Sequence, residues 1–72
     1  MNTFEEVIFE NGTIIKRLGI FHNTNNGDIE ELENSVNNYY NGTNFKLFDY
    51  GEGYIVLEDT ETNLNIQLEC IN

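Results

Sequence analysis

Apolar and polar residues alternate most regularly near the end of the chain. Leu64, Ile66, Leu68 and Cys70 are each separated by one polar residue. This spacing of two is typical of a strand with one buried face. It predicts a final strand that turns these four side chains, including the Cys70 thiol, into the core.

A second alternating stretch begins the chain and ends at a strong turn signal. Residues 4–10 are followed by Asn11-Gly12, the dipeptide most typical of a two-residue hairpin. We therefore predict a hairpin of residues 4–10 and 13–21, in which Gly19 marks a bulge. With Asn11-Gly12 at the tip, three cross-strand pairs are expected: Phe9 with Ile14, Ile8 with Ile15, and Glu6 with Arg17.

Another hairpin is predicted in the second half of the chain. Residues 45–50 and 54–58 are rich in aromatic and β-branched side chains and are separated by Gly51-Glu52-Gly53. If residues 59–62 then form a loop, the last strand pairs with 54–58. Two pairs are expected from this register: Leu57 with Leu64 and Ile55 with Ile66.

Between the two hairpins the apolar spacing becomes that of a helix. Asp28 and Glu31 have the spacing of a capping box, and Asn41-Gly42 supplies a stop. Five apolar residues fall within one arc of about 100°: Ile29, Leu32, Val36, Tyr39 and Tyr40. The order ββαβββ indicates a small α+β fold, with one amphipathic helix packed on an antiparallel sheet.

Length and composition predict one compact acidic domain over residues 1–72. A chain of 72 residues buries only about 60% of the surface that its unfolded form exposes, so its core is small. Its hydrophobic content of 39% nevertheless exceeds that of a disordered acidic tail. Most tyrosines should therefore belong to the core, with one or two left for a binding patch.

Charge gives the clearest functional signal. Thirteen acidic residues oppose three basic ones, for a net charge of −10, and beyond Gly27 the only cation is Lys46. Binding to nucleic acid or to an anionic membrane requires clusters of Lys and Arg, and Lys16-Arg17 is the only adjacent basic pair. We therefore expect a basic protein as the partner, with no direct contact to nucleic acid or membrane.

The sequence also favours a cytoplasmic location. The first residues lack the basic start and apolar stretch of a signal peptide, and no apolar run approaches the roughly 20 residues of a membrane span. Cys70 is the only cysteine, which agrees with a reducing compartment.

Motifs for catalysis, metals and cofactors are absent. Residues 22–33 match part of a calcium loop, but His22 and Thr24 occupy positions that require Asp or Asn. Cys70 and His22 are too few for a zinc site, and Ser35 lies in no nucleophile motif. We expect no catalytic residue, metal ligand or cofactor, and interpret Asp28 as a helix cap.

Dense groups of acids without a neighbouring cation are the candidate binding residues. Such acids lie at the helix start and at the two later turns. The predicted partner-binding residues are Asp28, Glu30, Glu31, Glu33, Glu52, Glu58, Asp59 and Glu61. A solubilising surface needs less charge and more mixing of signs than this chain has.

The leading hypothesis is a non-enzymatic inhibitor that docks on the basic, nucleic-acid-binding surface of a protein, where it acts as a nucleic-acid mimic. In size, charge and lack of motifs the chain is similar to the small proteins that phages use against host nucleases, including anti-CRISPR and anti-restriction proteins. An immunity protein or antitoxin against a basic toxin is the alternative within the same class. A small metal-dependent enzyme is the alternative from another class.

Overall fold

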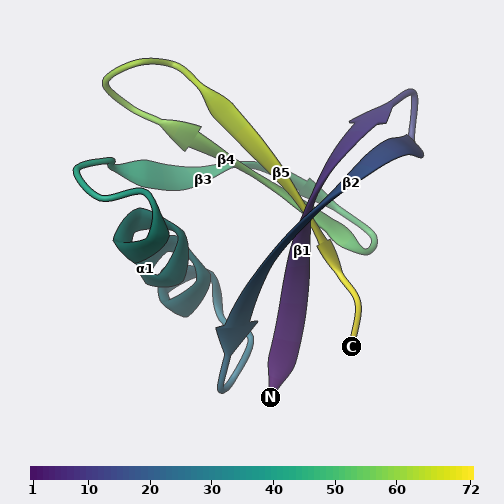
Figure 1. Ribbon diagram of the computed structural model, residues 1–72, viewed down its shortest axis with the longest axis horizontal. Coiled ribbons are helices and arrows are strands. Elements are labelled where there is room, and N and C mark those ends of the chain that lie inside the picture. Colours follow the sequence, from purple (N-terminus) through teal and green to yellow (C-terminus); the bar gives the residue numbers. More distant parts are fainter.

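Five strands and one helix form the fold, in the order that the sequence predicts (Figure 1). The computed structural model describes residues 1–72. In chain order the elements are β1 (Asn2–Glu10), β2 (Thr13–Thr24), α1 (Ile29–Tyr39), β3 (Phe45–Gly51), β4 (Tyr54–Asp59) and β5 (Asn65–Cys70). The α+β class and the ββαβββ order are thus confirmed.

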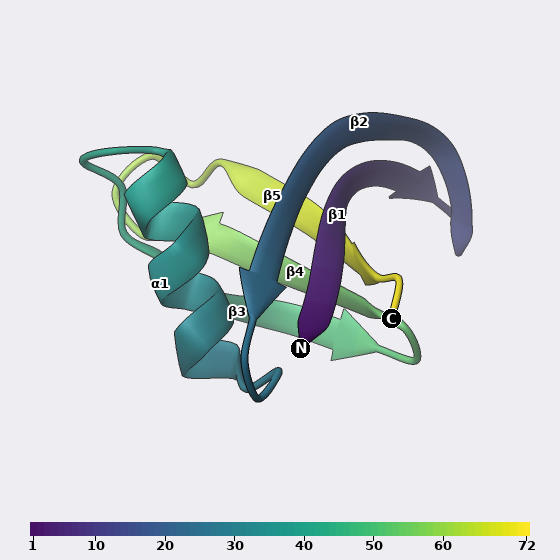
Figure 2. The ribbon, with the colours of Figure 1, turned by 60° about the horizontal axis from the view of Figure 1, so that its bottom comes forward.

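The strands form one sheet in the order β2-β1-β5-β4-β3, and every pair is antiparallel. The first and last strands of the chain therefore lie side by side in the middle of the sheet. Figure 2 shows that the β1–β2 hairpin is strongly curved, whereas β3 and β4 are nearly straight.

The tip of the first hairpin follows the sequence prediction. Asn11 and Gly12 have φ angles of 52° and 78°, as a two-residue turn with a right-handed twist requires. Phe9 lies opposite Ile14, as predicted. The turn at Asn11-Gly12 therefore produces the predicted pairing next to the tip.

The other two predicted pairs of this hairpin are wrong. Ile8 lies opposite Lys16, and Val7 opposite Arg17, because Ile15 is an extra residue that bulges out of the ladder. A second irregularity follows around Gly19, whose φ of 71° suits a residue without a side chain. The predicted bulge at Gly19 is confirmed.

The helix begins as the capping pattern predicts. Asp28 Oδ1 accepts the Glu31 amide at 2.8 Å, while the Glu31 carboxylate accepts the Asn25 amide instead of returning to the cap. Leu32 and Val36 are fully buried. Tyr39 is 58% exposed, so the buried stripe is narrower than the predicted arc.

One apolar cluster joins the helix to the sheet. Its buried members come from the helix and four of the strands, and Tyr40, Ile55 and Ile66 pack against it. They are Phe4, Leu32, Val36, Phe45, Leu57 and Leu68. Val7 and Val56 are buried outside this cluster, where Phe9 meets Tyr54 edge to face at 4.8 Å.

The last hairpin is shifted by two residues from its predicted register. Leu57 lies opposite Ile66, and Ile55 opposite Leu68, because the Asp59 amide donates to the Leu64 carbonyl and closes a longer loop. A shift of two leaves each side chain on its predicted face. Leu64 falls outside the strand and is 64% exposed.

The predicted burial of Cys70 is wrong. Its thiol is free and exposed and lies 3.3 Å from the Asn72 carbonyl oxygen. Cys70 is the last residue of β5, and the apolar cluster reaches only as far as Leu68 on this strand. Alternation therefore predicted the face correctly but not the end of the core.

The two edge strands of the sheet, β2 and β3, are protected from pairing with another chain in different ways. Side chains of α1 bond to the β3 backbone: Asn37 accepts the Phe45 amide at 2.6 Å and donates to its carbonyl at 3.1 Å, and Glu33 accepts the Leu47 amide at 2.7 Å. On β2 the two bulges and the exposed Lys16 interrupt the edge. Both devices hinder pairing with another chain.

Candidate functional site

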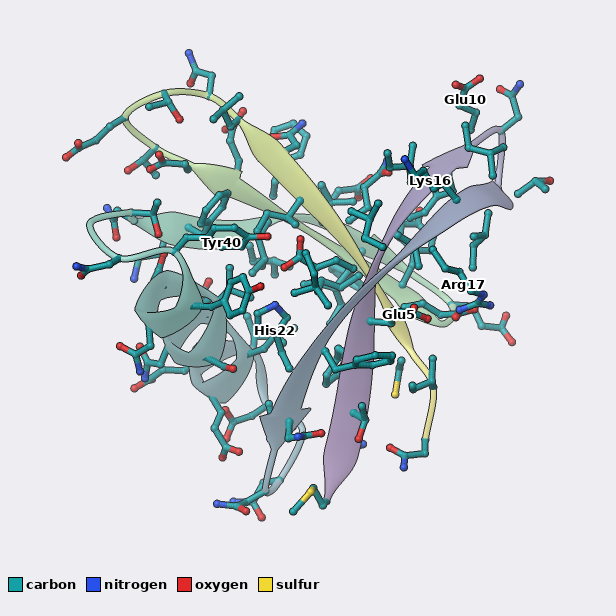
Figure 3. The ribbon with its side chains drawn as sticks, in the orientation of Figure 1. Glu5, Glu10, Lys16, Arg17, His22 and Tyr40 are labelled. Carbon is teal, nitrogen blue, oxygen red and sulfur yellow. The ribbon has the colours of Figure 1, made fainter.

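A polar cluster lies inside the molecule, where β1, β2 and α1 meet. The Glu6 carboxylate accepts hydrogen bonds from the Tyr40 hydroxyl at 2.7 and 2.8 Å and lies 2.8 Å from His22 Nε2. The other ring nitrogen of His22 lies 3.3 Å from Ser35 Oγ. Glu6 and His22 are each only 2% exposed, and Figure 3 shows His22 and Tyr40 close together between helix and sheet.

Glu6 faces the core because of its place in β1. It pairs with Leu68 of β5, whose side chain belongs to the apolar cluster, and opposite it β2 is irregular around Gly19. Burial, together with the hydrogen bond to Glu6, raises the pKa of the Tyr40 phenol well above its usual range. Tyr40 therefore remains a hydrogen-bond donor to Glu6 at any physiological pH.

Ser35, His22 and Glu6 are the residue types of a hydrolytic triad, but their placement differs from that of an active site. Four hollows open on the surface, and neither Ser35 nor His22 lines any of them. A nucleophile must reach its substrate. We therefore assign the cluster a structural role, in which each buried polar group finds a partner.

The acids at the helix start lie on one open face. Asp28, Glu30, Glu31 and Asn34 line a shallow hollow of about 440 Å³ that has no apolar wall. Asp28 caps the helix and Glu31 accepts the Asn25 amide. Glu30 is exposed and makes no such bond, so its charge is free to meet a partner.

Glu33 borders the β3–β4 hairpin beside the helix start, and Glu52 lies in the turn of this hairpin, where it also lines a hollow with Phe9, Gly12 and Ile14 of the first hairpin. Glu33 bonds to the backbone of β3 through the Leu47 amide. Glu52 is exposed in the turn between β3 and β4. We call Asp28, Glu30, Glu31, Glu33 and Glu52 the helix-start surface.

The acids of the β4–β5 loop lie elsewhere. The loop bonds to the segment that follows the helix, through the Thr60 amide and the Asn44 carbonyl. Glu61 is exposed and Glu58 is partly exposed opposite Lys46. The structure thus separates Glu58 and Glu61 from the helix-start surface.

Asp59 is the one predicted binding residue that the fold buries, at 4% exposure. Its carboxylate accepts the Thr62 hydroxyl at 2.8 Å and the amides of Asn44 and Glu61 at 3.2 and 3.4 Å. The Thr62 bond, then the two backbone bonds, hold the pKa of the Asp59 carboxyl below its usual range. Asp59 therefore organises the loop.

The cations leave the helix-start surface uncompensated, whereas Lys46 lies opposite Glu58 beside the β4–β5 loop. Arg17 pairs with Glu5 at 2.7 Å and Glu69 at 2.6 Å, and Figure 3 shows Arg17 beside Glu5 on the hairpin. The hydrogen bonds that Arg17 donates to Glu69, and then to Glu5, raise the pKa of its guanidinium. Lys16 and Lys46 make no ion pair, and α1 contains no cation.

Sequence reasoning missed the Glu6 cluster. One signal was present: Glu6 stands between the apolar residues Phe4 and Ile8 at a spacing of two. The partners of Glu6 come from β2 and α1, and no local pattern links them.

The fold contains neither a group of metal ligands nor a helix that could cross a membrane. No three side chains of the His, Cys, Asp and Glu types are grouped to hold a metal ion. His22, the first position of the calcium loop considered above, lies in β2 and faces Glu6. The helix is too short and too polar to cross a membrane.

In comparisons with known proteins, no protein family, curated protein or solved structure matches this chain. The fold and the chemistry of its side chains are therefore the basis for a functional proposal.

Proposed function

We propose that this protein is a non-enzymatic inhibitor that docks its helix-start surface on the basic, nucleic-acid-binding surface of another protein. The carboxylates take the place of backbone phosphates, and the protein competes with DNA or RNA. A phage anti-defence protein, of the anti-CRISPR or anti-restriction kind, is the biological role that this chemistry fits best.

The proposal rests on the uneven distribution of acidic and basic side chains over the surface. The net charge is −10, the one cation that forms carboxylate pairs is Arg17, and the helix-start surface has five acids and no cation. Neighbouring carboxylates on a helix lie roughly 5–6 Å apart, close to the spacing of phosphates along a nucleic acid. Such a surface attracts a basic partner and repels nucleic acid.

The test begins by capturing partners from a bacterial lysate at low and at high salt. A basic nucleic-acid-binding protein retained only at low salt is then purified with its labelled DNA or RNA. We expect this protein to displace the nucleic acid, with a potency that falls as salt rises. The protein alone should not retard DNA or RNA.

Matched charge reversals locate the surface. Glu30→Lys with Glu52→Lys alters the helix-start surface, and Glu58→Lys with Glu61→Lys makes the same charge change in the β4–β5 loop. We expect the first pair to weaken displacement by more than about tenfold and the second pair to weaken it far less. Full potency in both folded variants would refute the mimic mechanism.

An immunity protein or antitoxin would use the same electrostatics. It differs in its partner, which would be a basic toxin rather than a nucleic-acid-binding enzyme of a defence system. Capture of a single toxin, with growth rescued on co-expression, would favour this alternative.

A further inference from the structure

An apolar hollow lies beside the acidic helix start. It has a volume of about 280 Å³ and is lined by residues of the first turn of α1 and of the β3–β4 hairpin: Ile29, Leu47, Tyr50, Gly51, Tyr54 and Ile55. Tyr50 is 70% exposed and Leu47 is 39% exposed. In so small a protein, exposed apolar surface of this kind indicates an interaction site.

Carboxylates surround this hollow. Asp28 and Glu30 flank Ile29 in the chain, Glu33 accepts the Leu47 amide, and Glu52 follows Gly51. The nearest cation in the chain, Lys46, faces the other side of the sheet, because it pairs with Glu58 and side chains alternate along β3. The rim of the hollow is therefore wholly acidic.

The floor of the hollow depends on a glycine. A Cβ atom at Gly51 would run into the ring of Tyr54 across the hairpin. Tyr54 also packs against Phe9, with ring centroids 4.8 Å apart. The Tyr54 ring is thus held in place, and the hollow is preformed.

An apolar centre with a charged rim is the usual anatomy of a specific interface. A few buried anchors at the centre supply most of the affinity, while rim charges supply steering. Proteins that bind single-stranded nucleic acid carry the complementary chemistry: cations along a groove and exposed aromatic rings on which bases stack.

We propose that the hollow and its acidic rim are one docking surface for a protein segment that combines arginine or lysine with an aromatic side chain. The aromatic ring enters the hollow against Tyr50, in the place where a base would stack, and the cations meet the rim. This inference rests on the proposed function and narrows the partner to proteins that bind single-stranded nucleic acid.

Two synthetic peptides test the inference: a short arginine-rich peptide with one central tryptophan, and the same peptide with alanine in that place. The chain contains no tryptophan, so the peptide's fluorescence reports binding directly, and a competition assay measures both affinities. We expect the tryptophan peptide to bind at least about tenfold more tightly, as a buried anchor would.

Two tyrosine variants locate the contact. Tyr50→Ala should remove the preference for tryptophan. Tyr39→Ala should keep it, because Tyr39 is 58% exposed but does not line the hollow. Both positions are exposed, so both variants should fold, which circular dichroism checks.

Each opposite result has its own meaning. Equal, salt-sensitive affinity for both peptides would overturn the aromatic anchor while leaving the electrostatic docking of the proposed function intact. A tryptophan preference that survives Tyr50→Ala would show that the hollow is not the site. No binding of either peptide at low salt would overturn both proposals.

Discussion

Carboxylates in this protein fall into two groups that composition alone does not separate. Glu6 and Asp59 are buried and accept several hydrogen bonds each, whereas Glu30, Glu52 and Glu61 are exposed and accept none. The first group specifies the fold, and the second supplies the charge that our proposal uses. Mutation should distinguish them.

Removing the Glu6 carboxylate should unfold much of the protein. Glu6→Ala removes the partner of the partly buried Tyr40 hydroxyl and of Nε2 in the buried His22 ring. Each unpaired buried group costs ~1–3 kcal/mol, so the free energy of unfolding should fall by about 2–6 kcal/mol. Tyr40→Phe should cost ~1–3 kcal/mol. Urea denaturation measures both.

The matched control for Glu6→Ala is Glu10→Ala, an exposed acid at the end of the same strand. It should change stability by less than about 0.5 kcal/mol. Equal effects at the two positions would contradict the role assigned to the buried cluster.

Asp59 should make stability depend on pH in the acid range. Its folded pKa is depressed, so its contribution is full above the unfolded value of about 3.9 and disappears as pH falls through the folded pKa. The melting temperature of Asp59→Asn should lie below that of the wild type at neutral pH. This difference should shrink below about pH 4.

Comparing the two proteins at each pH is essential, because acid also relieves the repulsion among the other carboxylates of both. Thermal unfolding followed by circular dichroism gives the two curves. A difference in melting temperature that stays constant down to pH 3 would show that the ionised Asp59 carboxylate and its hydrogen bonds do not stabilise the fold.

At the scale of elements, local signals predicted a great deal. Asn11-Gly12 predicted the first turn, and Asp28 predicted the start of the helix. The alternation that begins at Leu64 predicted the last strand. Register was less predictable. The bulge at Ile15 has no turn residue to mark it, and the extra length of the β4–β5 loop arises from bonds to Asp59.

The contact between α1 and β3 gives a prediction at this scale. Asn37 makes three hydrogen bonds, two to the Phe45 backbone and one to the Thr43 hydroxyl. Asn37→Ala should lower the free energy of unfolding by roughly 1.5–4.5 kcal/mol, at ~0.5–1.5 kcal/mol per bond. It should also uncover the β3 edge and promote self-association at high salt.

Asn38→Ala is the control, since Asn38 is an exposed neighbour in the same helix that makes no such bond. The gain in helix propensity from alanine is common to both variants. Sedimentation in high salt compares their association. If Asn38→Ala associates as readily as Asn37→Ala, the edge is not what Asn37 protects.

At the scale of the whole molecule, the sheet order lay beyond sequence reasoning. It depends on the pairing of β1 with β5, and no local pattern announces a contact between the two ends of a chain. Only part of the candidate site was predictable, because it too depends on contacts between segments that are distant in sequence. The acids at residues 28–33 are visible in sequence, but their proximity to Leu47 and Tyr50 appears only in the fold.

The net charge should make this protein more stable in salt. Thirteen acids and three bases give strong self-repulsion, which added ions screen. The melting temperature should rise between low salt and about 0.5 M sodium chloride, where the Debye length falls to roughly 4 Å. The Glu30→Lys/Glu52→Lys variant, which carries less negative charge, should show a smaller rise. An equal rise in both would point to a non-electrostatic effect of salt.

The central place of β5 has a consequence for synthesis on the ribosome. Both hairpins of the first 59 residues can close locally, but β1 and β4 each keep one edge unpaired until the final strand arrives between them. Leu68, a fully buried core residue, is translated after every other buried member of the apolar cluster. The nascent chain therefore exposes two open strand edges until β5 has emerged, so its folding should draw on chaperones that shield such edges.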